Sequence, residues 1–285
     1  MLVELHRHTT YSVRSKVFIE GLNTPREMLM HAKKLGLGAL AITDHDEIKG
    51  SLEARKIAKK YGVIAIPGEE ITTRSGHVVA LGIDKFVKPG MSVEETIDTV
   101  HDLGGITIGV HPFDIRNEGI SELSRKTDAI ESFNAINIER FSNKKAKNFA
   151  KIHRKPQVAG SDAHWTEMMG YGVNEIEAHS VDDILSAIKK GKARIHGSYI
   201  PSSTILRWSI MRLEFSYDEV MNYINSNYRM PKRVISRNLL GLVNRSPGKI
   251  DYLFRLFGYC GLGYAFAYSV IKNHRSSLRY RPMVF

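Results

Sequence analysis

Short apolar runs alternate with amphipathic, capped segments along the first 200 residues. The runs are rich in Val and Ile and about five to seven residues long, a length and composition typical of buried strands. Seven such strands are predicted, over residues 2–6, 38–43, 63–67, 77–83, 106–111, 129–133 and 157–161.

Helix-start signals lie between several of these runs. Thr24-Pro25-Arg26-Glu27 offers an N-cap, a proline at the first helical position and a capping-box glutamate, which predicts a helix to about residue 35. Ser92 and Ser180 open similar patterns, and helices also fit 51–61 and 143–153. This alternation predicts a parallel sheet, open or closed. Seven strands in so short a stretch favour a small β/α barrel over a two-layer sandwich.

The alternation stops after residue 197. Helical pieces are predicted over 217–224 and 232–242, and residues 256–271 form an uncharged segment. A membrane-spanning helix needs about 20 apolar residues, and this shorter segment contains three glycines, so a buried or partner-packed helix is favoured. We therefore expect an α/β barrel over 1–197 and a helical C-terminal extension of unknown role over 198–285.

Charge is concentrated in that extension. The chain of 285 residues has a formal net charge of +11, with 41 Lys and Arg against 30 Asp and Glu. Of these, 13 basic and 4 acidic residues lie in 201–285, so that segment has a net charge of +9 and the rest only +2. The single cysteine, Cys260, excludes an internal disulfide and a Cys-rich zinc site. We expect a reducing, cytoplasmic setting and no signal peptide.

The candidate chemistry lies where the predicted strands end. Five apolar runs are followed by histidines or carboxylates: His6 and His8, Asp44 and His45, Glu69 and Glu70, His111, and Asp162 and His164. In a β/α barrel the carboxyl ends of the strands meet on one face. Each group alone could be a surface feature or a turn, but five together favour a metal site. His77 precedes its run, so it can join the site only through an antiparallel strand or a hairpin.

The residue types restrict the metals. Imidazole and carboxylate ligands without thiolate suit Zn²⁺, Mn²⁺ or Fe²⁺, and the number of candidates exceeds what one ion needs. We therefore expect two or three divalent ions. The other histidines are expected to be structural or solvated; these are His31, His101, His153, His179, His196 and His274. No phosphate-binding loop, dinucleotide-binding glycine motif or nucleophile elbow is present in the sequence.

Five ordered motifs in residues 1–197 resemble those of the PHP (polymerase and histidinol phosphatase) superfamily. They are His6-Arg7-His8-Thr9, Ile42-Thr43-Asp44-His45, Pro67-Gly68-Glu69-Glu70, His111-Pro112 and Gly160-Ser161-Asp162-Ala163-His164. The resemblance implies a distorted seven-stranded barrel with two or three metals at the strand ends. It places the first metal on His6, His8, Glu70 and Asp162. Glu70 would bridge to a second metal on His77 and His111, and a third would use His45 and His164.

The sequence departs from the family pattern at two places. The pattern commonly begins with aspartate, and here Glu4 stands in that position. A carboxylate or histidine usually follows the first motif, whereas residues 11–15 read Tyr-Ser-Val-Arg-Ser and offer no ligand. We expect Arg14 either to supply positive charge for substrate phosphate in place of a third metal ligand, or to point to solvent.

The resemblance implies a metal-dependent phosphoesterase acting on a nucleotide or a small phosphorylated metabolite. A hydroxide bridging the metals would attack phosphorus. Glu70, His164 and Arg14 are the candidate catalytic residues, and His164, His45 or a water could protonate the leaving oxygen. Further phosphate contacts could come from Arg116, Arg140 and Lys144.

Three alternatives stay open at this point. The basic tail is compatible with an exonuclease, because phosphate contacts favour nucleic-acid affinity. A damaged third site is compatible with a metal-binding regulatory module. Residues 250–285 could also contact an anionic membrane surface, or pack on the barrel or on another subunit. Neither the substrate nor the oligomeric state follows from the sequence.

Overall fold

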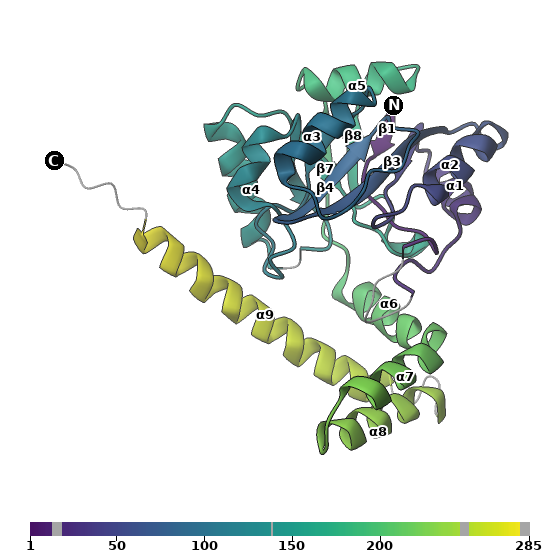
Figure 1. Ribbon diagram of the computed structural model, residues 1–285, viewed down its shortest axis with the longest axis vertical. Coiled ribbons are helices and arrows are strands. Elements are labelled where there is room, and N and C mark those ends of the chain that lie inside the picture. Colours follow the sequence, from purple (N-terminus) through teal and green to yellow (C-terminus); the bar gives the residue numbers. More distant parts are fainter. Residues whose placement is uncertain (13–18, 138, 246–250, 280–285) are drawn as a thin grey trace.

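A single mixed sheet of nine strands forms the frame of the protein (Figure 1). The computed structural model describes residues 1–12, 19–137, 139–245 and 251–279. The strand order is β7-β6-β5-β4-β3-β2-β1-β8-β9. The strands are β1 (Leu2–Glu4), β2 (Ala39–Ile42), β3 (Ile64–Thr73), β4 (Gly76–Leu81), β5 (Ile106–Gly109), β6 (Ala129–Asn134), β7 (Gln157–Gly160), β8 (Gly172–Glu175) and β9 (Arg194–Gly197).

The seven predicted apolar runs correspond to β1–β7. The pairs β1–β2, β2–β3, β5–β6 and β6–β7 are parallel, whereas β4 runs antiparallel to both β3 and β5. The sequence did not indicate β8 and β9, which pair antiparallel with each other, with β8 also paired to β1. Both are short and contain polar residues, so they lack the continuous apolar pattern of a central strand.

The sheet curls until its two ends nearly meet. The Asn174 amide of β8 spans the gap to β7, accepting from the Ala159 N–H at 2.9 Å and donating to the Ala159 carbonyl at 2.8 Å. A side chain thus supplies the hydrogen bonds that a closing strand would have made. The predicted distorted barrel with a helical C-terminal extension is confirmed.

Helices begin where the capping signals lie. Thr24 and Ser92 form complete capping boxes with Glu27 and Glu95, and the Ser180 hydroxyl accepts from the Asp183 N–H. The barrel helices are α1 (Pro25–Lys34), α2 (Lys49–Ile57), α3 (Val93–Asp102), α4 (Phe141–Ile152) and α5 (Val181–Lys189). Short 3₁₀ helices are η1 (Ala58–Tyr61), η2 (Ser121–Lys126) and η3 (Thr166–Met168).

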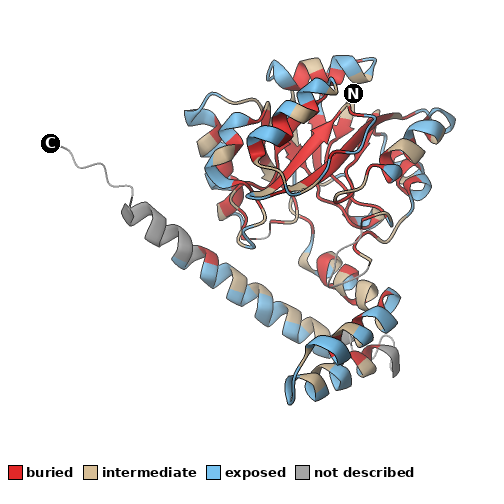
Figure 2. Ribbon diagram, in the orientation of Figure 1, coloured by how far each residue is buried: buried red, intermediate tan, exposed pale blue. Residues whose placement is uncertain are grey.

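The strands of the barrel are almost entirely buried (Figure 2). Two main hydrophobic clusters pack on their opposite faces. On β2, Leu40 and Ile42 pack with α1 and α2, while the alternate residues Ala39 and Ala41 pack with α5. This alternation follows the two-residue period of a strand. The polar residues that follow each buried strand therefore lie beyond the core, at the ends of the strands.

The extension comprises α6 (Ser202–Phe215), α7 (Tyr217–Asn227), α8 (Lys232–Arg245) and α9 (Asp251–Arg279). α6 joins the barrel's own core, because Ile205 and Trp208 belong to the cluster that covers α1 and α2. α7 and α8 pack on each other around a small separate cluster. α9 runs back past the barrel on the side of α4 (Figure 1).

Exposed aromatic side chains mark α9, with Tyr252, Tyr259 and Tyr264 each more than half exposed. Among the described residues, the apolar stretches of the helices are too short or too interrupted to cross a membrane.

Candidate metal centre

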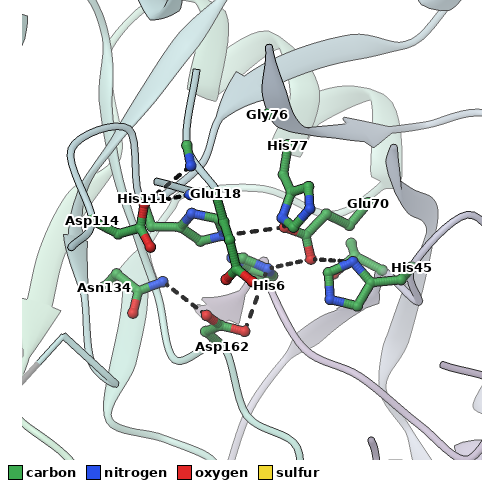
Figure 3. Close-up of polar contacts among 12 residues, drawn as sticks. His6, His45, Glu70, Gly76, His77, His111, Asp114, Glu118, Asn134 and Asp162 are labelled. Carbon is green, nitrogen blue, oxygen red and sulfur yellow. Dashed lines mark hydrogen bonds and ion pairs between the residues drawn. The ribbon is translucent and has the colours of Figure 1, made fainter. Parts of the chain in front are cut away.

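Histidines and carboxylates carried by six strands converge on one end of the barrel (Figure 3). The segments after β1, β2, β5 and β7 supply His6 and His8, His45, His111, and Asp162 and His164; β3 supplies Glu70 and β4 supplies His77. All eight predicted ligands are buried. β4 starts with Gly76 and runs antiparallel to β3, so His77 lies at the same end of the barrel as the other ligands. This is one of the two arrangements under which His77 was expected to join the site.

Glu70 lies at the centre of this cluster. Its Oε1 is 3.0 Å from His77 Nδ1 and 3.1 Å from His111 Nε2. Its Oε2 is 3.2 Å from both His6 Nε2 and His8 Nε2. His45 Nδ1 also lies 3.3 Å from Oε2. The two oxygens thus face different histidines, which is the arrangement that a bridging carboxylate requires. Glu69, one residue earlier, points to the other side of β3, where it accepts from the Val87 N–H at 3.1 Å.

Asp162 completes the group around His6 and His8. Its Oδ1 lies 3.2 Å from His8 Nε2 and 3.7 Å from His6 Nε2. Asp162 and His111 both have positive φ angles, 53° and 28°. Such backbone strain in residues other than glycine is typical of functional sites. It turns both side chains inward at the points where their strands end.

A carboxylate that was not predicted from the sequence lies beside His45 and His164, the residues expected to hold a third metal. Glu20 Oε2 lies 3.5 Å from His45 Nε2, and its Oε1 lies 3.6 Å from His164 Nε2. Residues 11–15 do not supply this carboxylate, but Glu20, further along the chain, places one beside His45 and His164. The missed signal is the pair Glu20-Gly21 shortly before the first helix. A side chain at position 21 would overlap the Thr9 backbone, so Gly21 lets the segment return to the centre. Arg14 lies outside the described residues.

This donor set fits divalent metal ions. An ion with ligand distances of about 2.1 Å holds neighbouring ligand atoms about 3.0–3.4 Å apart. The nitrogen–oxygen distances around Glu70 lie in that range, between 3.0 and 3.3 Å. Four groups of three ligand atoms lie within 4.8 Å of one another. These are His8, His45 and His164; His6, His8 and Glu70; His6, His111 and Asp162; and His45, Glu70 and His77.

The pKa values of the buried carboxylates and imidazoles also indicate that the centre favours positive charge. Burial opposes ionisation of Glu70, but the charges of the surrounding imidazoles hold its pKa well below the ordinary value. Asp162 behaves in the same way, against His6 and His8. Burial lowers the pKa of His8, yet Asp162 and Glu70 outweigh it and raise that pKa to about 9. The two buried carboxylates thus favour positive charge at this centre, which bound cations would supply.

Hydrogen bonds from the outer nitrogens fix the orientation of two imidazoles. His164 Nδ1 lies 2.7 Å from the Asp162 carbonyl, and His6 Nδ1 lies 2.9 Å from Glu131 Oε1. Both partners accept, so each Nδ1 carries the proton and each Nε2 presents its lone pair to the centre. This assigns His164 the geometry of a ligand.

Glu131 is a second residue that sequence reasoning missed. It lies within the otherwise mainly apolar strand β6. The acidic residue in a strand expected to be buried was the feature of the sequence that could have identified it. Its Oε2 accepts from the His111 N–H at 2.8 Å and from Asn134 Nδ2 at 2.9 Å. A side chain at Gly160 would overlap Glu131 Oε1, so the adjacent strand leaves room for this carboxylate.

Glu4 and Arg7 form a buried pair beside the centre. Arg7 Nη2 lies 2.5 Å from Glu4 Oε2, and the Ser161 hydroxyl also bonds Glu4. Both side chains are fully buried. Glu4 therefore supports the loop after β7, and its partners among the described residues are Arg7, Ser161 and Gly170 rather than the histidine cluster. Asp44 has a comparable role, accepting from the Thr9 N–H at 2.5 Å and the Thr9 hydroxyl at 2.8 Å.

Of the basic residues considered for phosphate contacts, Arg116 lies nearest to the cluster. Its Nη2 is 4.0 Å from Asp162 Oδ2, and its Nε pairs with Asp114 and Glu118. Arg140 stacks on Tyr199, and Lys144 is exposed on α4. The geometry therefore favours Arg116 over Arg140 and Lys144.

The remaining histidines lie apart from the centre where the structure describes their side chains. His101 pairs with Asp128 at 2.7 Å. His196, for which the sequence offered no acidic partner, pairs with Glu175 across the antiparallel strands β8 and β9 at 2.9 Å. These are surface ion pairs of the kind that contribute little to stability.

The C-terminal extension reaches this centre through α6. The Trp208 ring lies 4.8 Å from the His164 ring. Arg212 Nε donates to the Ile19 carbonyl at 3.3 Å, and the Ser216 hydroxyl accepts from the Ile19 N–H at 3.1 Å. α6 therefore holds the segment that carries Glu20.

Comparison with known proteins gives matches to sequence families and to curated sequences. A family model described as the PHP domain matches residues 4–155, and one described as PHP-associated matches 140–193. Over 165 residues the chain is 34% identical to the uncharacterized protein MJ1587 of Methanocaldococcus jannaschii, covering 56% of this chain and 96% of that protein. Over 86 residues it is 38% identical to a 5'-3' exoribonuclease of Haemophilus influenzae, spanning 29% of each chain.

A solved structure supports the fold. PsfC from Pseudomonas syringae is similar with a TM-score of 0.58 at 18% sequence identity, over 75% of this chain and 98% of that one.

Proposed function

The chain belongs to the PHP domain family, and on that premise we propose that it is a metal-dependent phosphoesterase that hydrolyses phosphate esters of a nucleotide or a small metabolite. The observation that carries the proposal is the position of Glu70, whose two oxygens face different histidines. Ligands in this arrangement suit two neighbouring ions, with Glu20, His45 and His164 available for a third.

Divalent ions held by these residues would polarise a phosphoryl oxygen and supply a water-derived nucleophile near neutral pH. The chain's own residues prepare the site for this chemistry. Glu131 and the Asp162 carbonyl fix the tautomers of His6 and His164, so their lone pairs point inward. Arg116 lies beside Asp162 and adds positive charge at the edge of the centre, where an anionic ester would approach.

The geometry of His164 favours a role as a metal ligand over a role as a proton donor. Its Nδ1 proton is engaged by the Asp162 carbonyl, and its Nε2 faces the centre. We therefore propose that a water molecule, rather than His164, protonates the leaving oxygen. His164 and Glu70 contribute to catalysis by holding the metals.

The test compares Glu70→Gln with Glu69→Gln in the full chain, loaded with Mn²⁺, Zn²⁺ or Fe²⁺ and assayed on a panel of phosphate mono- and diesters. Glu70→Gln removes the central charge. It should lower the number of metal ions bound per chain and should reduce kcat by at least about a hundredfold. Glu69 is the matched control. Burial raises its pKa to about 8, so a neutral amide resembles the form present at pH 7.

Two results would contradict the proposal. Wild type that binds metal and hydrolyses no ester of the panel would instead support a binding or regulatory module. Retention of activity in Glu70→Gln would show that the site is assigned to the wrong residues. Circular dichroism of both variants checks that the fold is intact.

A second candidate, an exonuclease, is favoured by the partial identity to the exoribonuclease and by the +9 charge of residues 201–285. Affinity for a single-stranded oligonucleotide should then fall steeply between 50 and 200 mM salt, on the order of tenfold or more. Binding that does not depend on salt would argue against this activity.

A further inference from the structure

A pocket of about 200 Å³ lies between the metal centre and the C-terminal helices. The barrel contributes Ile115 and Ile136, α6 contributes Ile205 and Trp208, and α9 contributes three residues. Those from α9 are Leu262, Ala265 and Phe266. Three separate parts of the chain therefore enclose one cavity, and α9 forms its outer wall.

The wall is mainly apolar. Its polar members are Arg116, Asn137 and Glu139. Two of these already have partners in the protein, because Asn137 Nδ2 donates to Asn143 at 3.3 Å and Glu139 Oε1 accepts from the Ser142 N–H at 3.2 Å. A polyhydroxylated ligand would leave hydroxyl groups against apolar side chains, which is unfavourable.

The pocket shares two wall residues with the surroundings of the metal centre. Trp208 lines the pocket and also lies 4.8 Å from the His164 ring. Arg116 lines it from another side, with Nη2 4.0 Å from Asp162 Oδ2. A ligand in the pocket would therefore contact side chains that themselves border the metal ligands, and Arg116 is the one cationic side chain of the described lining.

We propose that this pocket binds the alcohol part of the phosphate ester, and that this alcohol is apolar, either aromatic or short and aliphatic. The proposal rests on the phosphoesterase function. A cavity of 150 Å³ lined by Leu, Ile and Phe is large enough for benzene, so the pocket accepts a group of about one ring. The phosphate would lie at the metal centre beside Arg116.

The inference gives the extension a role. α9 is the wall that determines which alcohol fits, and α6 connects it to the barrel. A nucleoside, with its polar sugar, would fit this wall less well than a benzyl group.

The experiment measures binding without turnover. Isothermal titration of the metal-loaded full chain compares benzylphosphonate with methylphosphonate, two non-hydrolysable probes that differ by one ring. Wild type should bind benzylphosphonate at least about tenfold more tightly. Ala265→Trp fills the pocket and should bring the two affinities within about twofold of each other.

Ala267→Trp is the matched control, since residues two apart lie on nearly opposite sides of a helix and Ala267 is exposed. It should keep the wild-type preference. Leu262→Ser provides a second test in case Ala265→Trp fails to fold, and it should also reduce the preference. Equal affinity of wild type for the two probes, or a preference unchanged in both pocket variants, would overturn the inference.

Catalysis separates this inference from the proposed function. Hydrolysis of benzyl phosphate should exceed that of glycerol phosphate in kcat/KM by a similar factor, and Ala265→Trp should remove the difference. A protein that hydrolyses glycerol phosphate or nucleotides better than benzyl phosphate would be a phosphoesterase with a different pocket ligand. Selective binding of benzylphosphonate without hydrolysis of any ester would refute the phosphoesterase function alone.

Discussion

The indole Nε1–H of Trp208 donates a hydrogen bond of 3.0 Å to the backbone carbonyl of Glu20. Trp208 belongs to α6 of the C-terminal extension, and Glu20 is the carboxylate that faces His45 and His164. Both residues are buried. The extension is therefore structurally coupled to one corner of the proposed metal centre.

Trp208→Phe removes this hydrogen bond and keeps an aromatic ring against His164. We expect the free energy of unfolding to fall by about 1 kcal/mol and the affinity of the most weakly bound ion to fall by about tenfold. Metal titration followed by elemental analysis measures the second effect. Trp165→Phe, in the same hydrophobic cluster, is the matched control. Equal loss of metal in both variants would mean that the effect is general destabilisation.

Glu20→Gln keeps the size of the side chain and removes its charge. We expect one metal ion fewer per chain after dialysis, because the two groups around Glu70 keep all their ligands. Elemental analysis gives the number directly, with Glu177→Gln on the exposed surface as control. An unchanged metal content would show that Glu20 is no ligand.

Glu131→Gln should weaken metal binding without removing a ligand. The amide places a donor where the carboxylate accepts from His6, the His111 N–H and Asn134. We expect metal affinity to fall about 10- to 100-fold and the free energy of unfolding to fall by about 1–3 kcal/mol. Competition with a chelating dye and urea denaturation measure the two quantities. Wild-type metal affinity in a destabilised variant would assign Glu131 a purely structural role.

Asp128→Asn tests the pH dependence of stability away from the metal centre. Burial would raise the pKa of Asp128, but hydrogen bonds from His101 and Thr107 outweigh it and lower that pKa. The native pKa therefore lies below the unfolded value of about 3.9. The stabilisation is complete above that value and disappears as the pH falls through the native pKa.

Urea denaturation of wild type and Asp128→Asn at pH 7, 5 and 3, after metal has been removed with a chelator, measures the difference in their free energies of unfolding. Wild type should exceed Asp128→Asn by about 1 kcal/mol at pH 7, and the difference should shrink at pH 3. A difference that stays constant across the three pH values would contradict the assignment of the charge to this carboxylate.

Local signals in the sequence predicted much of the fold. The caps at Thr24, Ser92 and Ser180 act over three residues, so the sequence alone specifies them. The buried strands β1–β7 follow from continuous apolar runs. Seven of the eight candidate ligands, all except His77, follow from the same runs, because parallel strands bring their carboxyl ends to one edge. The grouping of ligands into three sets came from the resemblance to the PHP superfamily.

Only the tertiary structure placed the remaining residues, because their contacts are distant in the chain. The antiparallel direction of β4, which brings in His77, depends on its pairing with β3 and β5. Contacts with α6 hold Glu20 beside His164. One of them is the hydrogen bond from Trp208, which lies 188 residues after Glu20 in the chain. Glu131 looks in sequence like one polar residue of an apolar strand, and its role becomes visible only beside His6. Local patterns determine which elements form, whereas side-chain packing between distant elements determines which of their polar groups meet.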